Sequence, residues 1–346
     1  MVYTPTHPRK VRGLLVHQTQ IEKNEEKATK GEKRKQEVES IIHQKESEIR
    51  QEDIEASYLV PEVEHFVDTP EVRELGDRIK LWIDAGYPVH LIGPTGCGKT
   101  TLAMNTAVEL GRPVVWINGD ESISTTDLIG GYSQLEKESL RDRYVHNVFK
   151  GKDIVKVEWI DNPLALACKY GYTLVYNEFS RTMPVANNVL LSVFEEGILE
   201  LPTKFSQERY IKVHPDFNAI LTSNSVEYAG VHRPQDALLD RMVGMYMDYY
   251  SFDTEVKIVI AHTGLKKHDA ERIVKVVRAL REKVSDTQKP GTRASVMVGR
   301  GLKALDSQKP ASLENLFIDV MATKTSSPAD FLEKQNLVRD ALLALK

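Results

Sequence analysis

One short stretch limits the possible folds of this chain more than any other. Residues 93–100 are Gly-Pro-Thr-Gly-Cys-Gly-Lys-Thr, which is the pattern G-x-x-x-x-G-K-T. The apolar run at residues 88–92 predicts a buried strand before it, and residues 99–110 predict a helix after it. Glycines allow successive backbone N–H groups to turn toward one anion, and a helix that begins at Lys99 adds the positive end of its dipole. The stretch therefore predicts a phosphate-binding loop between a strand and a helix.

A loop of this kind predicts ATP and Mg²⁺ as ligands. The Lys99 side chain would reach the β- and γ-phosphates, and the Thr100 hydroxyl would ligate Mg²⁺. The residues expected to bind the nucleotide are consecutive: Gly93, Pro94, Thr95, Gly96, Cys97, Gly98, Lys99, Thr100 and Thr101. The chain has only two cysteines, Cys97 and Cys168, whose separation gives no metal-ligand spacing or disulfide framework. Cys97, inside the loop, is interpreted as filling an unconstrained loop position, and redox control of nucleotide binding is the alternative.

A second apolar run, residues 173–176, ends in the polar pair Asn177 and Glu178. ATPases with such a loop usually have Asp and then Glu at this place, where the Asp holds Mg²⁺ through water and the Glu activates the attacking water. Asn177 can still accept a hydrogen bond from Mg²⁺-bound water, but it brings no charge. We therefore predict Glu178 as catalytic and Asn177 as a metal-site residue beside Thr100, with weaker Mg²⁺ binding and slower turnover.

Predicted strands and helices alternate up to about residue 252, and only helices follow. The further predicted strands are residues 114–117, 174–176, 218–222 and 243–247, which favours an α/β fold with a parallel sheet and helices on both faces. The later predicted helices are residues 254–262, 270–284, 294–305, 312–321 and 328–345. The sequence therefore predicts a charged N-terminal extension (residues 1–60), an α/β nucleotide-binding domain (residues 61–252) and a smaller all-helical lid domain (residues 253–346).

The N-terminal extension has too few apolar residues to bury a face. Residues 22–55 are dense in Glu, Lys and Gln and contain no aromatic residue, which is typical of a solvated tail or a single frayed helix. The alternative is a partner-binding arm that becomes ordered on contact. The net charge of −4 argues against a nucleic-acid partner. No apolar run approaches the ~18 residues of a membrane span, and no signal peptide is predicted. The two cysteines, in unrelated contexts, fit a reducing compartment, so we expect a cytoplasmic protein.

Beyond the loop, the chain resembles the MoxR-like branch of the AAA+ ATPases and, within it, the gas vesicle protein N family. The resemblance extends from about Phe66 to the last predicted helices. The stretches that carry it are residues 66–70, 85–90, 101–103, 127–131, 159–162, 167–169, 187–191, 227–232, 235–238 and 240–242. It implies an AAA+ P-loop domain with a helical lid, ATP hydrolysis and a homo-oligomeric ring, taken as a hexamer. It also implies gas vesicle shell or accessory proteins as partners.

The resemblance implies roles for residues outside the loop. Asn224 matches the first sensor, which helps place the attacking water, and Arg293 matches the second sensor, from the lid. Arg241 matches the arginine finger, which would reach the γ-phosphate bound by a neighbouring subunit. Arg181 is a further interface candidate. Two insertions around the pore of the ring match residues 131–171 and 196–213; the first suits a hairpin that grips another protein and equally one that packs on its own domain.

The favoured function is a ring-forming ATPase that acts as a chaperone or remodeller in gas vesicle formation, in the cytoplasm and in association with the vesicle. Two alternatives stay open. One keeps the fold and changes the client, giving a MoxR-like activator of a metalloenzyme. The other is a nucleotide-binding structural component of the vesicle with little hydrolysis, because Asn177 removes a charge from the site.

Overall fold

The computed structural model describes residues 65–141, 151–202, 209–225, 232–285, 288–305, 313–322 and 325–344. Within them, the side chains of residues 132–141 and 151–158 are not described. The extension predicted at residues 1–60 lies outside the described residues, as does most of the quoted stretch 227–232.

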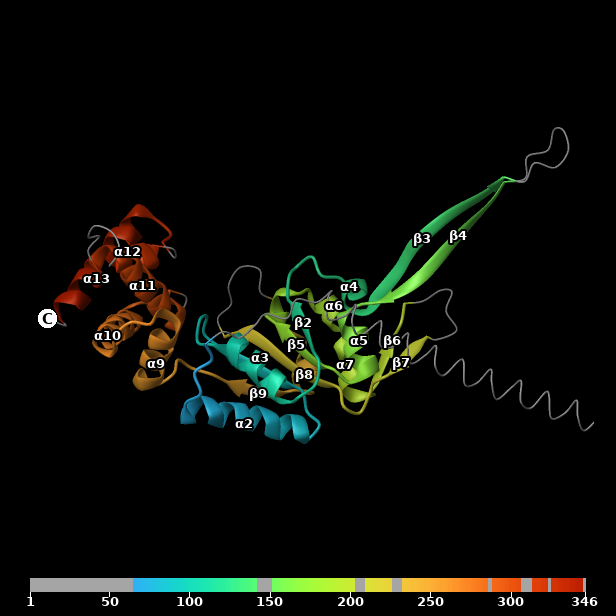
Figure 1. The fold of residues 1–346 in the computed structure, drawn as a ribbon, viewed down its shortest axis with the longest axis horizontal. Helices are drawn as coiled ribbons and strands as arrows, with labels where there is room; N and C mark the ends of the chain where they lie inside the picture. The colour runs from blue at the N-terminus through green and yellow to red at the C-terminus, as the bar shows by residue number, and fades with distance from the viewer. Residues whose placement is uncertain are drawn as a thin grey trace, which may run out of the picture. The chain divides into compact units, whose positions relative to one another are not determined.

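A five-stranded parallel sheet forms the centre of the α/β part (Figure 1). Its strands are β1 (Val89–Gly93), β2 (Val114–Asn118), β5 (Thr173–Asn177), β8 (Asn218–Asn224) and β9 (Val243–Tyr246), in the order β2-β5-β8-β1-β9. All four pairings are parallel. β5 is buried along its whole length, as expected for a parallel sheet that is covered on its faces. The predicted α/β fold class is confirmed, and each predicted strand overlaps a strand of this sheet.

Helices α2 (Pro70–Asp84), α3 (Lys99–Glu109) and α5 (Pro163–Tyr170) pack on this sheet. α2 begins as predicted: Pro70 needs no N–H partner in the first turn, and the Thr69 hydroxyl accepts a hydrogen bond from the Val72 N–H at 3.3 Å. α3 lies across β1, β5 and β8. Buried apolar side chains of α2, α3 and the strands form one core, which includes Ile79, Leu91, Leu102, Val175 and Ile220.

Two antiparallel hairpins interrupt the α/β part. β3 (Gly130–Arg141) pairs with β4 (Gly151–Asp161) and extends away from the central sheet in Figure 1. This hairpin ends at Asp161, earlier than the end predicted at Gly171, because Pro163 begins α5, whose apolar residues pack on β2 and β5. The second hairpin pairs β6 (Ile198–Glu200) with β7 (Tyr210–Lys212), inside the second predicted insertion.

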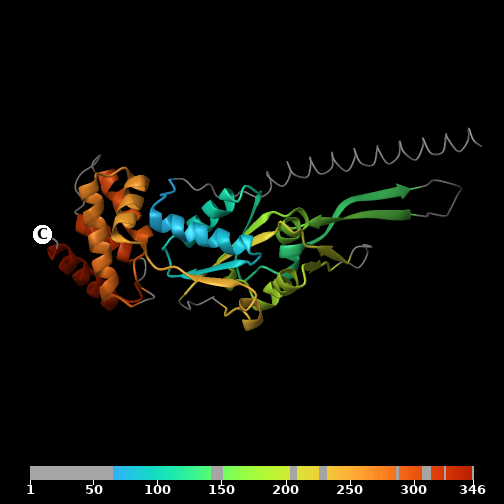
Figure 2. The same cartoon turned by 90° about the horizontal axis from the view of Figure 1, so that it is seen from below.

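After β9, every element in the described part of the chain is a helix (orange to red in Figure 2). These are α9 (Phe252–Thr263), α10 (Lys267–Lys283), α11 (Thr292–Leu305), α12 (Leu313–Ala322) and α13 (Pro328–Leu343), which match the five predicted helices. They enclose an apolar core of their own, which includes Ile273, Leu280, Val298, Phe317 and Val338. None of the helices in the described ranges is long and apolar enough to cross a membrane.

Candidate functional site

Polar residues singled out from the sequence meet at the carboxyl edge of the sheet. Gly93 of β1 is opposite Asn224 of β8, and Asn118 of β2 is opposite Asn177 of β5. β5 and β8 are neighbours, so these strand ends are contiguous with the loop that follows β1. Open α/β sheets bind ligands in the crevice outside the carboxyl ends of their strands. The sheet therefore places the predicted site where such folds bind ligands.

The loop between β1 and α3 has the backbone conformation that a polyphosphate needs. Gly96 and Gly98 have φ values of 79° and 100°, in the left-handed region that glycine adopts without steric cost. Gly98 directly precedes α3, whose first N–H groups and positive dipole end are available to an anion. The geometry is therefore that of a phosphate-binding loop.

Lys99 is buried, and its ammonium group contacts the buried Cys97 sulfur at 3.8 Å as well as neutral oxygens. Cys97 therefore does not occupy the unconstrained loop position predicted for it. Nζ donates to Gly93 O at 2.9 Å, to Pro94 O at 2.8 Å and to Asn224 Oδ1 at 3.3 Å. Burial lowers the pKa of Lys99; the Glu178 carboxylate opposes this shift, Arg293 adds to it, and the net change is downward. A buried cation whose hydrogen-bond partners carry no full charge is stabilised by an anionic ligand. The Lys99 environment therefore fits a phosphate group.

Thr100 is linked to Asn177 by a short hydrogen bond. The Thr100 hydroxyl donates to Asn177 Oδ1 at 2.6 Å, and the Thr222 hydroxyl donates to the same atom at 3.0 Å. Asn177 Nδ2 donates to Asn118 Oδ1 at 2.7 Å, which directs the amide oxygen of Asn177 toward Thr100. Because the Thr100 proton points to Asn177, the lone pairs of its oxygen remain free for a cation. Asn118 is a site residue that the sequence analysis missed.

This arrangement of side-chain oxygens fits a Mg²⁺ ion that arrives with a triphosphate. Mg²⁺ keeps several waters and binds through one or two protein groups together with substrate phosphates. Among the described residues, no group of three or more His, Cys, Asp or Glu residues could hold a metal ion by itself. Thr100 offers a neutral oxygen and Asn177 holds it through a neutral amide, so phosphate oxygens would supply most of the negative charge around the ion.

Asn177→Asp is expected to lower the Mg²⁺ concentration needed for half-maximal ATP binding by about tenfold, because a carboxylate adds a charge beside the cation. Asn118 can turn its amide to donate to the new carboxylate, so this contact is kept. The measurement is a Mg²⁺ titration of binding with a fluorescent ATP analogue. Asn162→Asp, which adds the same charge at the start of α5, is the control. If both variants keep the wild-type Mg²⁺ dependence, Asn177 does not lie beside the cation.

Glu178 follows Asn177 in a left-handed backbone conformation, with φ 49° and ψ 40°. Its backbone N–H donates to Thr222 Oγ1 at 3.0 Å, and its carboxylate forms an ion pair with Arg181. A residue other than glycine in this region is strained, and such strain is concentrated at functional sites. The chain therefore holds the Glu178 carboxylate at the strand end, next to the residue that contacts Thr100.

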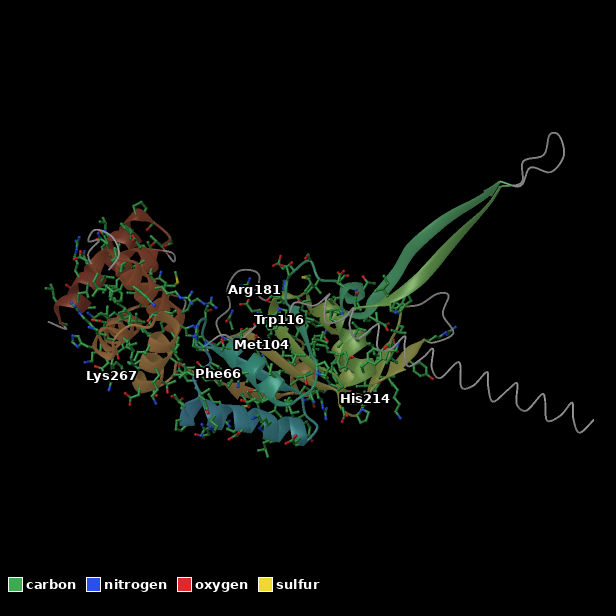
Figure 3. The ribbon with its side chains drawn as sticks, viewed as in Figure 1. Phe66, Met104, Trp116, Arg181, His214 and Lys267 are labelled. Carbon is green, nitrogen blue, oxygen red and sulfur yellow. The ribbon has the colours of Figure 1, made fainter. Side chains whose placement is uncertain are left out.

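A cavity of about 480 Å³ adjoins the phosphate loop. Gly96, Gly98 and Thr101 line it on the loop side, and Arg293 lines it from the start of α11. It is also lined by residues that the sequence analysis did not predict as site residues, including His65, Phe66 (labelled in Figure 3), Tyr250, Ile258, His262 and Val296. A largely apolar cavity beside a phosphate loop suits the planar base of a nucleotide.

The predicted sensor arginine, Arg293, and the predicted finger arginine, Arg241, lie in different places. A Cβ atom added at Gly96 would lie 3.5 Å from the Cβ of Arg293, so Arg293 is next to the phosphate loop. Arg241, just after α8 (Asp236–Leu239), instead donates from Nε to Glu195 Oε2 of α7 (Val189–Glu195) at 2.8 Å. The role predicted for Arg241 concerns the nucleotide of a second subunit, and it stays a prediction.

The parallel sheet, the phosphate loop and the helical part that follows define an AAA+ protein, and the family model described as AAA domain (dynein-related subfamily) matches residues 88–242. The Gas vesicle ATPase GvpN of Haloferax mediterranei is 54% identical over 288 residues, which cover 83% of this chain and 82% of that protein. The Gas vesicle ATPase GvpN1 of Halobacterium salinarum is 49% identical, over 93% of this chain and 92% of that protein. The chain therefore belongs to the GvpN family of gas vesicle ATPases.

Among solved structures, the Holliday junction branch migration motor RuvB of Thermotoga maritima is similar to this chain. It matches with a TM-score of 0.43 and 17% sequence identity, over 75% of this chain and 70% of that chain. A likeness at this level supports no conclusion about function.

Proposed function

We propose that this protein binds ATP with Mg²⁺, hydrolyses it, and uses the reaction to remodel or chaperone a protein during gas vesicle formation. The observation that carries the proposal is the buried Lys99 ammonium at the base of a glycine-rich loop, whose hydrogen-bond acceptors are three neutral oxygens and the Cys97 sulfur. Membership of a family of gas vesicle ATPases supports both the reaction and its setting.

In this proposal the loop binds the triphosphate before any bond changes. Backbone N–H groups of residues 95–101 surround the phosphates, and Lys99 exchanges carbonyl contacts for β- and γ-phosphate oxygens. Thr100 would hold Mg²⁺ through its oxygen while its proton stays directed to Asn177. When bound, Mg²⁺ supplies positive charge that polarises the phosphates. The cavity beside the loop holds the base and sugar.

Glu178 then accepts a proton from the attacking water, and Asn224 orients that water. The water oxygen forms a bond to the γ-phosphorus while the bond from that phosphorus to the β–γ bridging oxygen breaks. Arg293 from α11 and Arg241 from a neighbouring subunit stabilise the negative charge of the transition state. A finger that acts on a neighbour requires a closed, head-to-tail assembly, so we propose a homo-oligomeric ring, taken as a hexamer.

The proposal assigns ATP binding and the activation of water to residues 61–252. To the lid, residues 253–346, it assigns Arg293 and nucleotide-dependent movement. Gas vesicle shell or accessory proteins are the proposed clients, and the cytoplasm and the vesicle surface are the proposed places of action. A nucleotide-binding structural component with little hydrolysis remains the second candidate. The neutral Asn177 at the predicted Mg²⁺ position is the observation that favours it.

A Glu178→Gln variant is expected to capture the client, because ATP that is bound and not hydrolysed holds the assembled ring in its loaded state. Tagged Glu178→Gln protein, purified in ATP and Mg²⁺ from cells that make gas vesicles, should retain gas vesicle proteins and release them in ADP. Lys99→Met, prepared in the same way, is the control that cannot load ATP. If both variants retain the same proteins in both nucleotides, binding does not depend on ATP and the remodelling proposal is wrong.

A further inference from the structure

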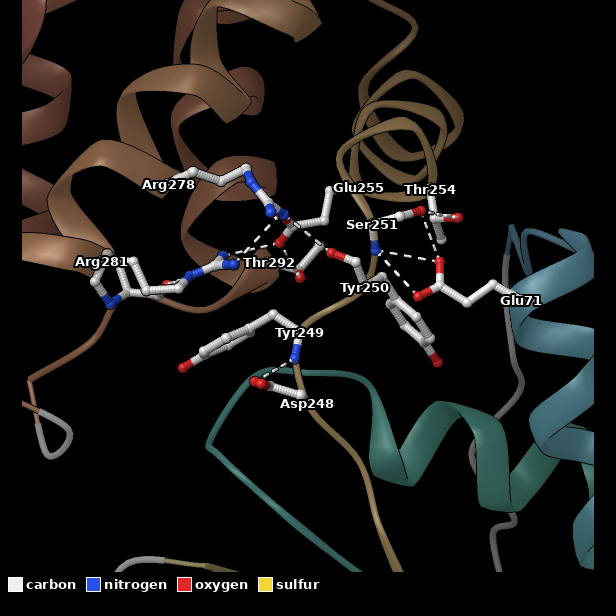
Figure 4. Close-up of polar contacts among 11 residues, drawn as sticks. Glu71, Asp248, Tyr249, Tyr250, Ser251, Thr254, Glu255, Arg278, Arg281 and Thr292 are labelled. Carbon is white, nitrogen blue, oxygen red and sulfur yellow. Dashed lines mark hydrogen bonds and ion pairs between the residues drawn. The ribbon is translucent and has the colours of Figure 1, made fainter.

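Glu255, in the first turn of α9, has a fully buried carboxylate that the proposed mechanism does not use. Oε1 accepts hydrogen bonds from Arg281 Nη2 and from Thr292 Oγ1, each at 2.8 Å, and Oε2 accepts one from Arg278 Nη1 at 2.9 Å (Figure 4). A buried carboxylate is tolerated only when charge and hydrogen bonds compensate it. Glu255, Arg278, Arg281 and Thr292 therefore form one compensated set, the Glu255 cluster.

The Glu255 cluster contacts the segment that joins β9 to α9. Arg278 Nη1 also donates to Tyr250 O at 3.0 Å, and the Arg281 guanidinium lies 3.7 Å from the ring centre of Tyr249 (Figure 4). The Tyr250 ring packs against the phosphate loop, because a Cβ added at Gly98 would lie 3.2 Å from it. Tyr250 therefore links the two: its backbone carbonyl contacts the Glu255 cluster, and its ring packs on the phosphate loop.

The Glu255 cluster also holds the turn that carries Arg293. Thr292, the first residue of α11, donates its hydroxyl to Glu255, and Arg293 follows it directly. On the other side of the turn, Arg281 Nε donates to Pro290 O at 3.0 Å. These two bonds fix the backbone on both sides of residue 291.

This turn lies directly against the phosphate loop. A Cβ added at Gly291 would lie only 2.6 Å from Thr95 O, so no larger residue fits between the turn and the loop. The backbone that carries Arg293 is therefore held on one side by the Glu255 cluster and confined on the other side by the phosphate loop. A charged side chain contributes most to a transition state when its supporting contacts hold it in place beforehand.

We propose that Glu255 is a positioning residue for Arg293: through Thr292 and Arg281 it sets the turn at residues 290–293 so that Arg293 meets the γ-phosphate. This inference rests on the proposed function, because it requires Arg293 to contact the phosphate that distinguishes ATP from ADP. A cluster that only stabilised the helical part would change the unfolding temperature without changing the preference for ATP.

The test is Thr292→Val, which keeps the shape of the side chain, removes its hydrogen bond to Glu255 and leaves both arginine ion pairs. The readout is the ADP dissociation constant divided by the ATP dissociation constant, measured calorimetrically with Mg²⁺ on the full chain. Thr292→Val and Arg293→Ala should each lower this ratio by about three- to tenfold. In the Arg293→Ala background, adding Thr292→Val should change the ratio by less than about twofold, because the two changes act on one interaction.

Thr263→Val is the matched control, because Thr263 is also buried but donates to Val259 O within α9. It should leave the ratio unchanged, and thermal unfolding without nucleotide checks that every variant is folded. The inference is wrong if Arg293→Ala lowers the ratio and Thr292→Val does not. It is also wrong if Thr292→Val lowers the ratio by the same factor in the Arg293→Ala background as in the wild type. If Arg293→Ala leaves the ratio unchanged, both this inference and the proposed role of Arg293 are wrong. The proposed roles of Lys99 and Glu178 are not affected by that result.

Discussion

Arg241→Ala is expected to lower the steady-state ATPase rate by about a thousandfold, while the ATP dissociation constant changes by less than about threefold. Within its own subunit, Arg241 pairs with Glu195 of α7, so its removal takes no contact from the phosphate loop of the same chain. Phosphate release by the assembled protein is the measurement. Arg233→Ala, which removes an exposed arginine paired with Asp236, is the matched control and should keep the wild-type rate.

Mixing variants tests whether Arg241 acts on a neighbour. Arg241→Ala subunits keep Glu178, and Glu178→Gln subunits keep Arg241, so each variant should be nearly inactive alone. In a one-to-one mixture with random assembly, about a quarter of the interfaces combine an intact site with an intact finger. Recovery of activity on mixing is therefore expected. If Arg241→Ala is as active as the wild type, or if mixing restores no activity, Arg241 is not a finger that acts on a neighbouring subunit.

Glu178→Gln is expected to reduce the maximal ATPase rate by about 10²- to 10⁴-fold, because glutamine cannot accept a proton from the attacking water. ATP binding should change little, since the backbone N–H of Glu178, which glutamine keeps, makes the contact with Thr222. Single-turnover hydrolysis and nucleotide titration measure the two effects separately.

Glu121→Gln, which removes an exposed carboxylate on the loop after β2, is the control for Glu178→Gln. If the wild type and Glu178→Gln release phosphate at the same rate, the protein is not an effective ATPase. The neutral Asn177 would then mark a site used for nucleotide binding alone.

The main chain of the candidate site could be predicted from the sequence because its signals are local. The phosphate loop, the strand before it and the helix after it lie within residues 88–110, and the left-handed glycines are where the pattern places them. The strand that ends at Asn177 was equally clear from its apolar run. Thr69 and Pro70 marked the beginning of α2, because capping also depends on neighbouring residues.

The remaining contacts depend on which distant segments become neighbours. Asn118 orients Asn177 only because β2 pairs with β5 in one particular register, which no local pattern specifies. The cavity brings Phe66 together with residues of α9 and α11, far along the chain. Glu255, in a sequence rich in Glu, was indistinguishable from a solvated carboxylate until the packing of α9, α10 and α11 buried it. Sequence patterns indicate which side chains are able to do the chemistry. Long-range packing decides which other residues orient those side chains.

The central claim is that Lys99 and the loop around it bind the triphosphate of ATP. Isothermal titration of ATP and Mg²⁺ into the wild type and into Lys99→Met tests it most directly. The loss of two charge-assisted hydrogen bonds, each contributing about 1.5 kcal/mol, should weaken ATP binding in Lys99→Met by at least about a hundredfold. Equal affinity of the two proteins for ATP, or no affinity of the wild type for ATP or ADP with Mg²⁺ present, would contradict the claim.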